Sequence, residues 1–320
     1  MKFSVDTHDT VGDALSRPEC VLCNRAGDIF ASHLGHGIAR IASDGTQSLI
    51  GHHAEVDGTA FVPNGFALLP DGGFLVANMG PAGGVWRLTA NGGIAPFLVE
   101  LEGKPLGATN FVMLDKDQRV WITVTTRHWP ISDAFNPAVA DGYIVVVDND
   151  GARIARDGLT FTNEMRFDAA GLFAFVVETM ARRISRLPVL DNGELGMPEI
   201  FAEFGHGTLP DGLAFDAEGH LWVTSLVSNR LIRADPTGSW EIVLEDCDPA
   251  QVDEVERLLA AGRLERDHMQ VSSGTLLKNL SSLAFGGADL KTVYLGSLGG
   301  DRIVSFRSPV AGLPLAHWAF

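Results

Sequence analysis

Six segments of this chain follow one pattern, and their spacing constrains the fold more than any other feature. Each segment has a polar opening residue, an alternating apolar strand, a turn that usually holds Asp and Gly, and a second apolar strand. The intervals between the openers are 45, 46, 53, 48 and 70 residues, which is typical of β-propeller blades. The six openers are Glu19, Asn64, Asn110, Asn163, Asp211 and Ser281.

A third strand follows each pair, and a short fourth strand follows most of them. The pattern therefore predicts an all-β fold: one six-bladed β-propeller domain over residues 1–320, with four antiparallel strands per blade. The sixth segment has three clear strands only. We expect its fourth strand to come from the N-terminus, near residues 2–5, and residues 315–320 are the other candidate.

Two segments interrupt the repeat. Residues 126–141 form a long loop in the third unit, on the same side as the openers, and loops of this length are often functional. In residues 246–269, Val252, Val255, Leu258 and Leu259 recur with helical spacing. This segment predicts a helical insertion before the sixth blade, beginning near Asp248, which explains the longest interval.

The composition restricts the partners. The chain has 46% hydrophobic and 20% charged residues, a composition typical of globular proteins. Its net charge is −16, and its sequence contains no cluster of Lys and Arg. Nucleic acid and anionic membranes are therefore poor partners. No signal peptide or membrane span is evident, so we expect a cytoplasmic location. A monomer and a homodimer both stay open. Cys20 and Cys23 lie in a predicted strand on opposite faces, so we expect them to pack in the core rather than share a metal.

The opening residues suggest a metal site. In a propeller the first strand of every blade lines the central channel, so the six openers should converge at one mouth. Glu19, Asn110, Asn163 and Asp211 would supply two carboxylates and two amide oxygens, a set that suits Ca²⁺ or Mg²⁺ better than Zn²⁺. Alternatively, the openers only cap strands and bind channel water. Unpaired carboxylates in a narrow channel are costly, which favours the metal.

Several short motifs occur along the chain in a specific order and spacing. They are R-P-E at Arg17 to Glu19, the opener Asn110, F-T-N at Phe161 to Asn163, L-P-D-G-L-A-F-D from Leu209, and S-L-A-F-G-G from Ser282. Together they resemble the SMP-30/gluconolactonase/luciferin-regenerating-enzyme family over residues 15–307. The resemblance implies a six-bladed propeller and one divalent metal held at Glu19, Asn163 and Asp211, with Asn110 on metal or substrate. It also implies lactone hydrolysis as the most common activity. Diisopropyl-fluorophosphatase has a similar propeller with a Glu/Asn/Asn/Asp calcium site.

The chain also departs from that family. Sugar-lactone members usually carry Arg two residues before the Asn110 position and Asp directly after it, whereas this chain has Ala108 and Phe111. The resemblance therefore favours a less polar ring than a sugar aldonolactone. We expect the substrate to contact residues around the metal and on the long loop. These are Asn64, Phe111, His128, Trp129 and Ser281, with Phe66 and Phe161 as further candidates for an apolar wall.

We therefore predict a metal-dependent hydrolase that opens a lactone, with Asp211 and Asn110 as its catalytic residues. Asp211 would act as base or nucleophile. Ca²⁺ is the expected ion, and Mg²⁺, Mn²⁺ and Zn²⁺ stay open. Two alternatives use the same site: a phosphotriester or fluorophosphate hydrolase, and a non-catalytic propeller scaffold with structural calcium.

Overall fold

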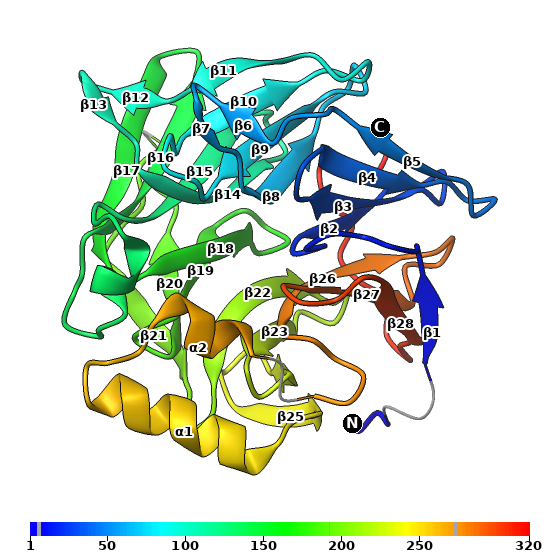
Figure 1. The fold of residues 1–320 in the computed structure, drawn as a ribbon, viewed down its shortest axis with the longest axis vertical. Helices are drawn as coiled ribbons and strands as arrows, with labels where there is room; N and C mark the ends of the chain where they lie inside the picture. Colours follow the sequence, from blue (N-terminus) through cyan, green and yellow to red (C-terminus); the bar gives the residue numbers. More distant parts are fainter. Residues whose placement is uncertain (5–7, 192, 272–273) are drawn as a thin grey trace.

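Six four-stranded antiparallel sheets surround a central channel, which confirms the predicted propeller (Figure 1). A computed structural model describes residues 1–4, 8–191, 193–271 and 274–320. Within each of the first five blades, the strands follow one another from the channel outward in chain order. Each blade is thus a local meander, which is why a repeat along the sequence becomes a repeat in space.

The bounds of the blade strands follow the predicted pattern. Blades 1 to 3 consist of β2 (Val21–Cys23), β3 (Ile29–His33), β4 (Gly37–Ile41) and β5 (Gln47–Ile50); β8 (Pro63–Leu68), β9 (Phe74–Asn78), β10 (Val85–Leu88) and β11 (Ile94–Leu98); β14 (Ala108–Leu114), β15 (Val120–Thr126), β16 (Gly142–Asp148) and β17 (Gly151–Leu159). Blades 4 to 6 consist of β18 (Thr162–Phe167), β19 (Phe173–Glu178), β20 (Arg183–Pro188) and β21 (Glu199–Glu203); β22 (Leu209–Phe215), β23 (Leu221–Leu226), β24 (Arg230–Ala234) and β25 (Trp240–Leu244); β26 (Leu280–Gly286), β27 (Thr292–Ser297), β28 (Ile303–Arg307) and β1 (Asp9–Val11).

The ring is closed by the N-terminal strand β1, which pairs antiparallel with β28 through Asp9 opposite Ser305. The prediction that a strand from the N-terminus closes the ring is therefore confirmed, but the predicted segment, residues 2–5, was wrong. Residues 2–4 form no strand, and residue 5 lies outside the described residues. Phe3 instead packs its ring against Phe306 at 4.5 Å. The C-terminal alternative was also wrong, because residues 315–320 contain turns and no strand.

The predicted helical insertion is present as α1 (Pro249–Ala260) and α2 (Arg266–Gln270), which lie beside blades 4 and 5 (Figure 1). Asp248 caps α1 by accepting a hydrogen bond from the Ala250 amide at 2.9 Å. Val252, Val255 and Leu258 are buried on one face, as the helical spacing predicts. They pack in a cluster that also contains residues of the mouth region, so the insertion forms part of the channel rim.

The remaining elements connect the blades. The long loop of blade 3 contains a single 3₁₀ turn, η1 (Ile131–Ala134), and two short hairpins precede blades 2 and 3. These hairpins are β6 (Glu55–Val56) with β7 (Thr59–Ala60), and β12 (Glu100–Leu101) with β13 (Lys104–Pro105). None of the helices in the described ranges is long and apolar enough to cross a membrane.

Hydrophobic packing between and within blades forms the core, and the two cysteines of the C-x-x-C sequence belong to it. Cys20 and Cys23 are free and buried, and they fall in two different hydrophobic clusters. Phe66 is also core, because it packs against Phe74 at a ring distance of 6.2 Å.

Candidate metal and substrate site

Five of the six opening residues lie at irregularities in the innermost strands, and the sixth, Glu19, precedes β2 in the chain with one residue between them. The register of the ladder shifts between Pro63 and Phe66 in β8, between Thr109 and Phe111 in β14, and between Pro210 and Leu213 in β22. Equivalent shifts occur in β18 and β26. A β-bulge re-aims the side chains that it contains, and here each bulge holds an opener.

Five of the six openers line one cavity at the mouth of the channel. The convergence predicted from the repeat is thus seen for the openers that carry carboxylate or carboxamide groups. These are Glu19, Asn64, Asn110, Asn163 and Asp211.

Three oxygens of the residues lining this cavity are buried and have no hydrogen-bond donor within the described part of the chain. They are Glu19 Oε2, Asn110 Oδ1 and Asn163 Oδ1. Leaving a buried acceptor unsatisfied costs about 1–3 kcal/mol, and more for a charged one. Three such oxygens beside the Asp211 carboxylate form the donor set that a hard divalent cation takes. The residues present therefore fit the metal ion that the sequence predicts.

Glu19 is held by residues of other blades. Asn64 donates from Nδ2 to Glu19 Oε1 at 3.1 Å and to the Asn110 carbonyl at 3.0 Å. Arg17 in turn donates to Asn64 Oδ1 at 2.7 Å. Ser281 donates from its hydroxyl to the Glu19 carbonyl at 2.7 Å. Asn64 and Ser281 thus position Glu19, and only Asn64 of the two lines the cavity.

The amide of Asn163 is oriented in the same way. Its Nδ2 donates to Asp211 Oδ1 and, at 3.1 Å, to Thr179 Oγ1. Since both amide hydrogens are used there, Oδ1 is left as the free atom of the carboxamide. This network selects one amide orientation, in which the oxygen is available as a ligand.

Burial and mutual repulsion raise the pKa values of the carboxyl groups at the site. Burial raises the pKa of Glu19 to about 8, against the opposing effect of Arg17. Burial, followed by the charges of Glu19 and Glu164, raises the pKa of Asp211 well above its usual range. Burial also raises the pKa of Glu164 to about 7, although Arg166 at 3.2 Å opposes it. Of these three carboxyl groups, Glu19 and Asp211 line the cavity, where a divalent cation would offset the cost of their charges.

The walls of the cavity are largely apolar, and several wall residues were not predicted. Ile131 and Phe135 reach the cavity from the long loop, and Met269 reaches it from α2. The prediction that the loop of residues 126–141 lies over the mouth is consistent with this placement. The length of the loop and its side of the propeller pointed to the site, but the loop and the helical insertion have no repeat-related equivalents, so the sequence did not indicate which of their residues reach the cavity.

Four of the five residues predicted as substrate contacts do not line this cavity: Ser281, whose hydroxyl donates to the Glu19 carbonyl, and Phe111, His128 and Trp129. Phe111 is buried in the core, where Arg166 lies over its ring at 4.5 Å. It directly follows Asn110, and neighbouring strand residues point to opposite faces. Trp129 is 53% exposed, and His128 is also exposed, with Nε2 at 3.7 Å from Asp141.

Two cavity residues have an unusual backbone. Arg17 and Phe161 each stand two residues before an opener, and their φ angles are +54° and +50°. A left-handed conformation at such residues costs on the order of 1–3 kcal/mol and often occurs at functional sites. Arg17 belongs to the R-P-E motif, yet the sequence pattern assigned it no role.

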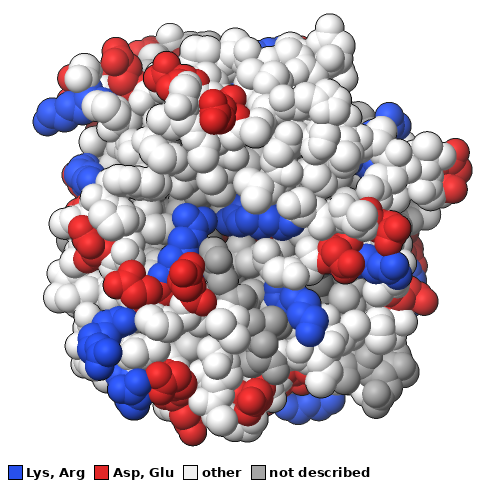
Figure 2. Space-filling view, viewed as in Figure 1, with Lys and Arg blue, Asp and Glu red and all other residues white. Residues whose placement is uncertain are grey.

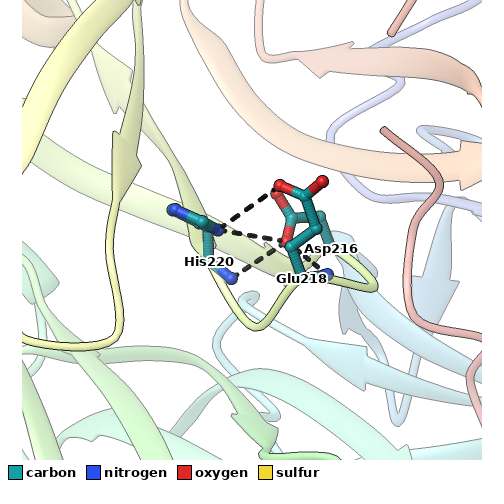
Figure 3. A group of neighbouring side chains, drawn as sticks. All are labelled: Asp216, Glu218 and His220. Carbon is teal, nitrogen blue, oxygen red and sulfur yellow. Dashed lines mark hydrogen bonds and ion pairs between the residues drawn. The ribbon is translucent and has the colours of Figure 1, made fainter. Parts of the chain in front are cut away.

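A second group of possible metal ligands lies in the β22–β23 turn: Asp216, Glu218 and His220 (Figure 3). The Asp216 carboxylate has a structural role. Its Oδ2 accepts hydrogen bonds from Trp222 Nε1 at 2.9 Å and from Arg233 at 2.8 Å. Asp115 and Trp121 form the same bond in blade 3 at 2.8 Å. This group is therefore a recurring turn, and it is not part of the cavity.

The fold and the cavity define a class: a six-bladed propeller with an oxygen-rich, cation-compatible site at one mouth of its channel. Residues 34–245 match the model of the SMP-30/gluconolactonase/LRE-like region, and the chain belongs to this family. The resemblance seen in the sequence is thereby confirmed.

Similar proteins agree with this membership. The chain is 26% identical over 236 residues to a 6-deoxy-6-sulfogluconolactonase of Pseudomonas putida, covering 72% of this chain and 67% of that one. The solved regucalcin of Agrobacterium tumefaciens, a calcium-binding protein, superposes with a TM-score of 0.70 at 18% identity, covering 100% and 99%. A gluconolactonase of Xanthomonas campestris gives 0.69 at 18%, covering 94% and 89%. At this identity, the two structures show a shared fold.

Proposed function

We propose that this chain is a divalent-metal-dependent hydrolase that opens a lactone, with Ca²⁺ as the resident ion. One observation carries the proposal: three buried acceptor oxygens without donors, of Glu19, Asn110 and Asn163, at a cavity that also holds Asp211. The names of two similar proteins, a sulfogluconolactonase and a gluconolactonase, support lactone chemistry, and the calcium-binding regucalcin supports the ion.

When bound, a divalent cation supplies electrophilic catalysis by drawing charge from a carbonyl oxygen. Glu19, Asn110, Asn163 and Asp211 would hold it. Asp211 is the proposed base toward water or the proposed nucleophile, and Asn163 orients its carboxylate. Asn110 is proposed to contact the reacting group or the ion. Asn64 and Ser281 hold Glu19 in place.

The walls support a substrate less polar than a sugar lactone. Ile131, Phe135 and Phe161 form one apolar side of the cavity, and the aromatic rings of Phe135 and Phe161 lie 5.3 Å apart. Apolar walls bind a ring through area removed from water, at about 25 cal/mol per Å². They also keep bulk water from the polar groups, which strengthens electrostatic effects there.

A panel of lactones tests the proposal. Metal-stripped protein is assayed on sugar, aliphatic and aromatic lactones after addition of Ca²⁺, Mg²⁺, Mn²⁺ or Zn²⁺. We expect turnover that depends on the added metal and is fastest with an apolar ring. Metal binding without turnover of any lactone would refute the proposal and favour the non-catalytic scaffold.

A further inference from the structure

Two guanidinium groups share the cavity with the carboxylates. Arg17 precedes Glu19 by two residues, Arg266 is the first residue of α2, and both line the cavity. Figure 2 shows basic side chains bordering the hollow near the centre of this face. Among the described residues, neither arginine has a carboxylate within ion-pairing distance, whereas most other arginines of the chain do.

The Arg17 guanidinium can donate more hydrogen bonds than it makes within the described part of the chain. It donates to the Pro63 carbonyl at 2.8 Å and to Asn64 Oδ1 at 2.7 Å. A guanidinium has five N–H groups, so these bonds leave further donors. Arg17 and Arg266 face the same cavity, and burial, followed by the positive charge of Arg17, lowers the pKa of Arg266.

The charges of the cavity favour an anion once the metal is present. The lining residues include two carboxyl groups, Glu19 and Asp211, and two guanidinium groups, Arg17 and Arg266. A divalent cation on the carboxylates would leave two positive charges unbalanced, in a space walled by apolar side chains. Unbalanced charge in such surroundings is costly, and a guanidinium binds a carboxylate or a sulfonate best through two parallel N–H···O hydrogen bonds.

We propose that the lactone opened here carries an anionic group, a carboxylate or a sulfonate, and that Arg266 together with Arg17 holds it. This inference rests on the proposed function. It adds a requirement for the substrate. The apolar ring of the lactone packs against Phe135 and Phe161, and its negatively charged group lies beside the two arginines.

Substrate preference tests the assignment. The calcium-loaded protein is assayed on a γ-lactone with a ring carboxylate and on the primary amide of the same compound. We expect kcat/KM to favour the carboxylate by about fifty-fold or more, and Arg266→Gln to reduce that ratio about ten-fold. Arg263→Gln removes an equal charge from the same segment, outside the cavity, and should leave the ratio unchanged. A wild-type ratio near one, or equal losses on both substrates in Arg266→Gln, would overturn the assignment.

A binding measurement separates this inference from the proposed function. Cyclopentanecarboxylate and cyclopentanecarboxamide, which contain no lactone, are titrated calorimetrically into calcium-loaded wild type, Arg266→Gln and Arg263→Gln. Tighter carboxylate binding that weakens about ten-fold only in Arg266→Gln supports the anion site, even if no lactone is hydrolysed. Equal binding of the two probes, or carboxylate binding unaffected by Arg266→Gln, overturns it.

Discussion

Asn64 donates a hydrogen bond to Glu19 at 3.1 Å across two neighbouring blades, although 45 residues separate them in the chain. Arg17 fixes the oxygen of the same amide at 2.7 Å. The amide therefore has one orientation, and it leaves Glu19 Oε2 as the oxygen without a donor. Asn64 of blade 2 thus orients Glu19, the proposed metal ligand that opens blade 1.

Replacing Asn64 should weaken metal binding. In Asn64→Ala the Glu19 carboxylate loses its donor, and loss of such a supporting bond typically costs 10–100-fold in metal affinity. We expect at least a ten-fold weaker calcium affinity by calorimetric titration of metal-stripped protein. Asn91→Ala, at an exposed turn of the same blade, is the control. An unchanged affinity in Asn64→Ala would contradict the proposed role of Glu19.

Asp211→Asn should abolish lactone hydrolysis and leave the fold intact. The change keeps the size of the side chain but removes one of two charges that would balance the metal. The measurements are turnover, bound metal per chain and melting temperature. Glu218→Gln alters the acidic turn of blade 5 and should retain one metal per chain, because we assign the metal to the channel mouth. Loss of the metal in Glu218→Gln but not in Asp211→Asn would reverse that assignment.

Metal affinity should depend on pH. Burial raises the pKa of Glu19 to about 8 in the metal-free protein, so the carboxyl is mostly protonated at pH 7. A metal binds the deprotonated form, so binding must release protons. We expect the apparent calcium affinity to rise between pH 6 and 8, and calorimetry in buffers of different ionisation enthalpy to show proton release. Affinity that is constant over this range would show that Glu19 is not a ligand.

His317 should make the protein less stable in mild acid. Burial, with a contribution from Arg166, lowers its pKa from 6.5 to about 4. The folded state therefore binds fewer protons than the unfolded state between these values, so stability rises with pH across this window and is lost as pH falls. The loss amounts to up to about 3 kcal/mol. Denaturant unfolding at pH 4 to 7 should show this slope, and His317→Gln should flatten it. An equal slope in that variant would refute the assignment.

Phe135→Ala should reduce catalysis, whereas Trp129→Ala should not. Phe135 is buried against Phe161 and lines the cavity, and Trp129 of the same loop is exposed. We expect kcat/KM on an apolar lactone to fall about ten-fold or more in Phe135→Ala, with about 3 kcal/mol lost in unfolding free energy. Trp129→Ala is the matched control for both measurements. A larger kinetic loss in Trp129→Ala would show that the loop moves over the site.

The sequence by itself determined the blades and the convergence of the openers. Both follow from short-range rules: alternation along a strand, turn residues between strands, and a repeat that places equivalent residues at equivalent points around a ring. The position of Asn110 and Asn163 in the repeat therefore predicted that both line the channel mouth, and both line the cavity there. The same rule explains why Phe111, the neighbour of Asn110, points away into the core.

Only the tertiary structure decided what else surrounds the site. Residues 126–141 and 246–269 have no counterpart in the repeat, so the positions of Phe135 and Arg266 depend on packing between segments far apart in the chain. The closing strand likewise shifted to Asp9–Val11, because its partner is the edge of β28. Local pattern cannot specify such contacts, since they gain free energy only when the ring is already formed.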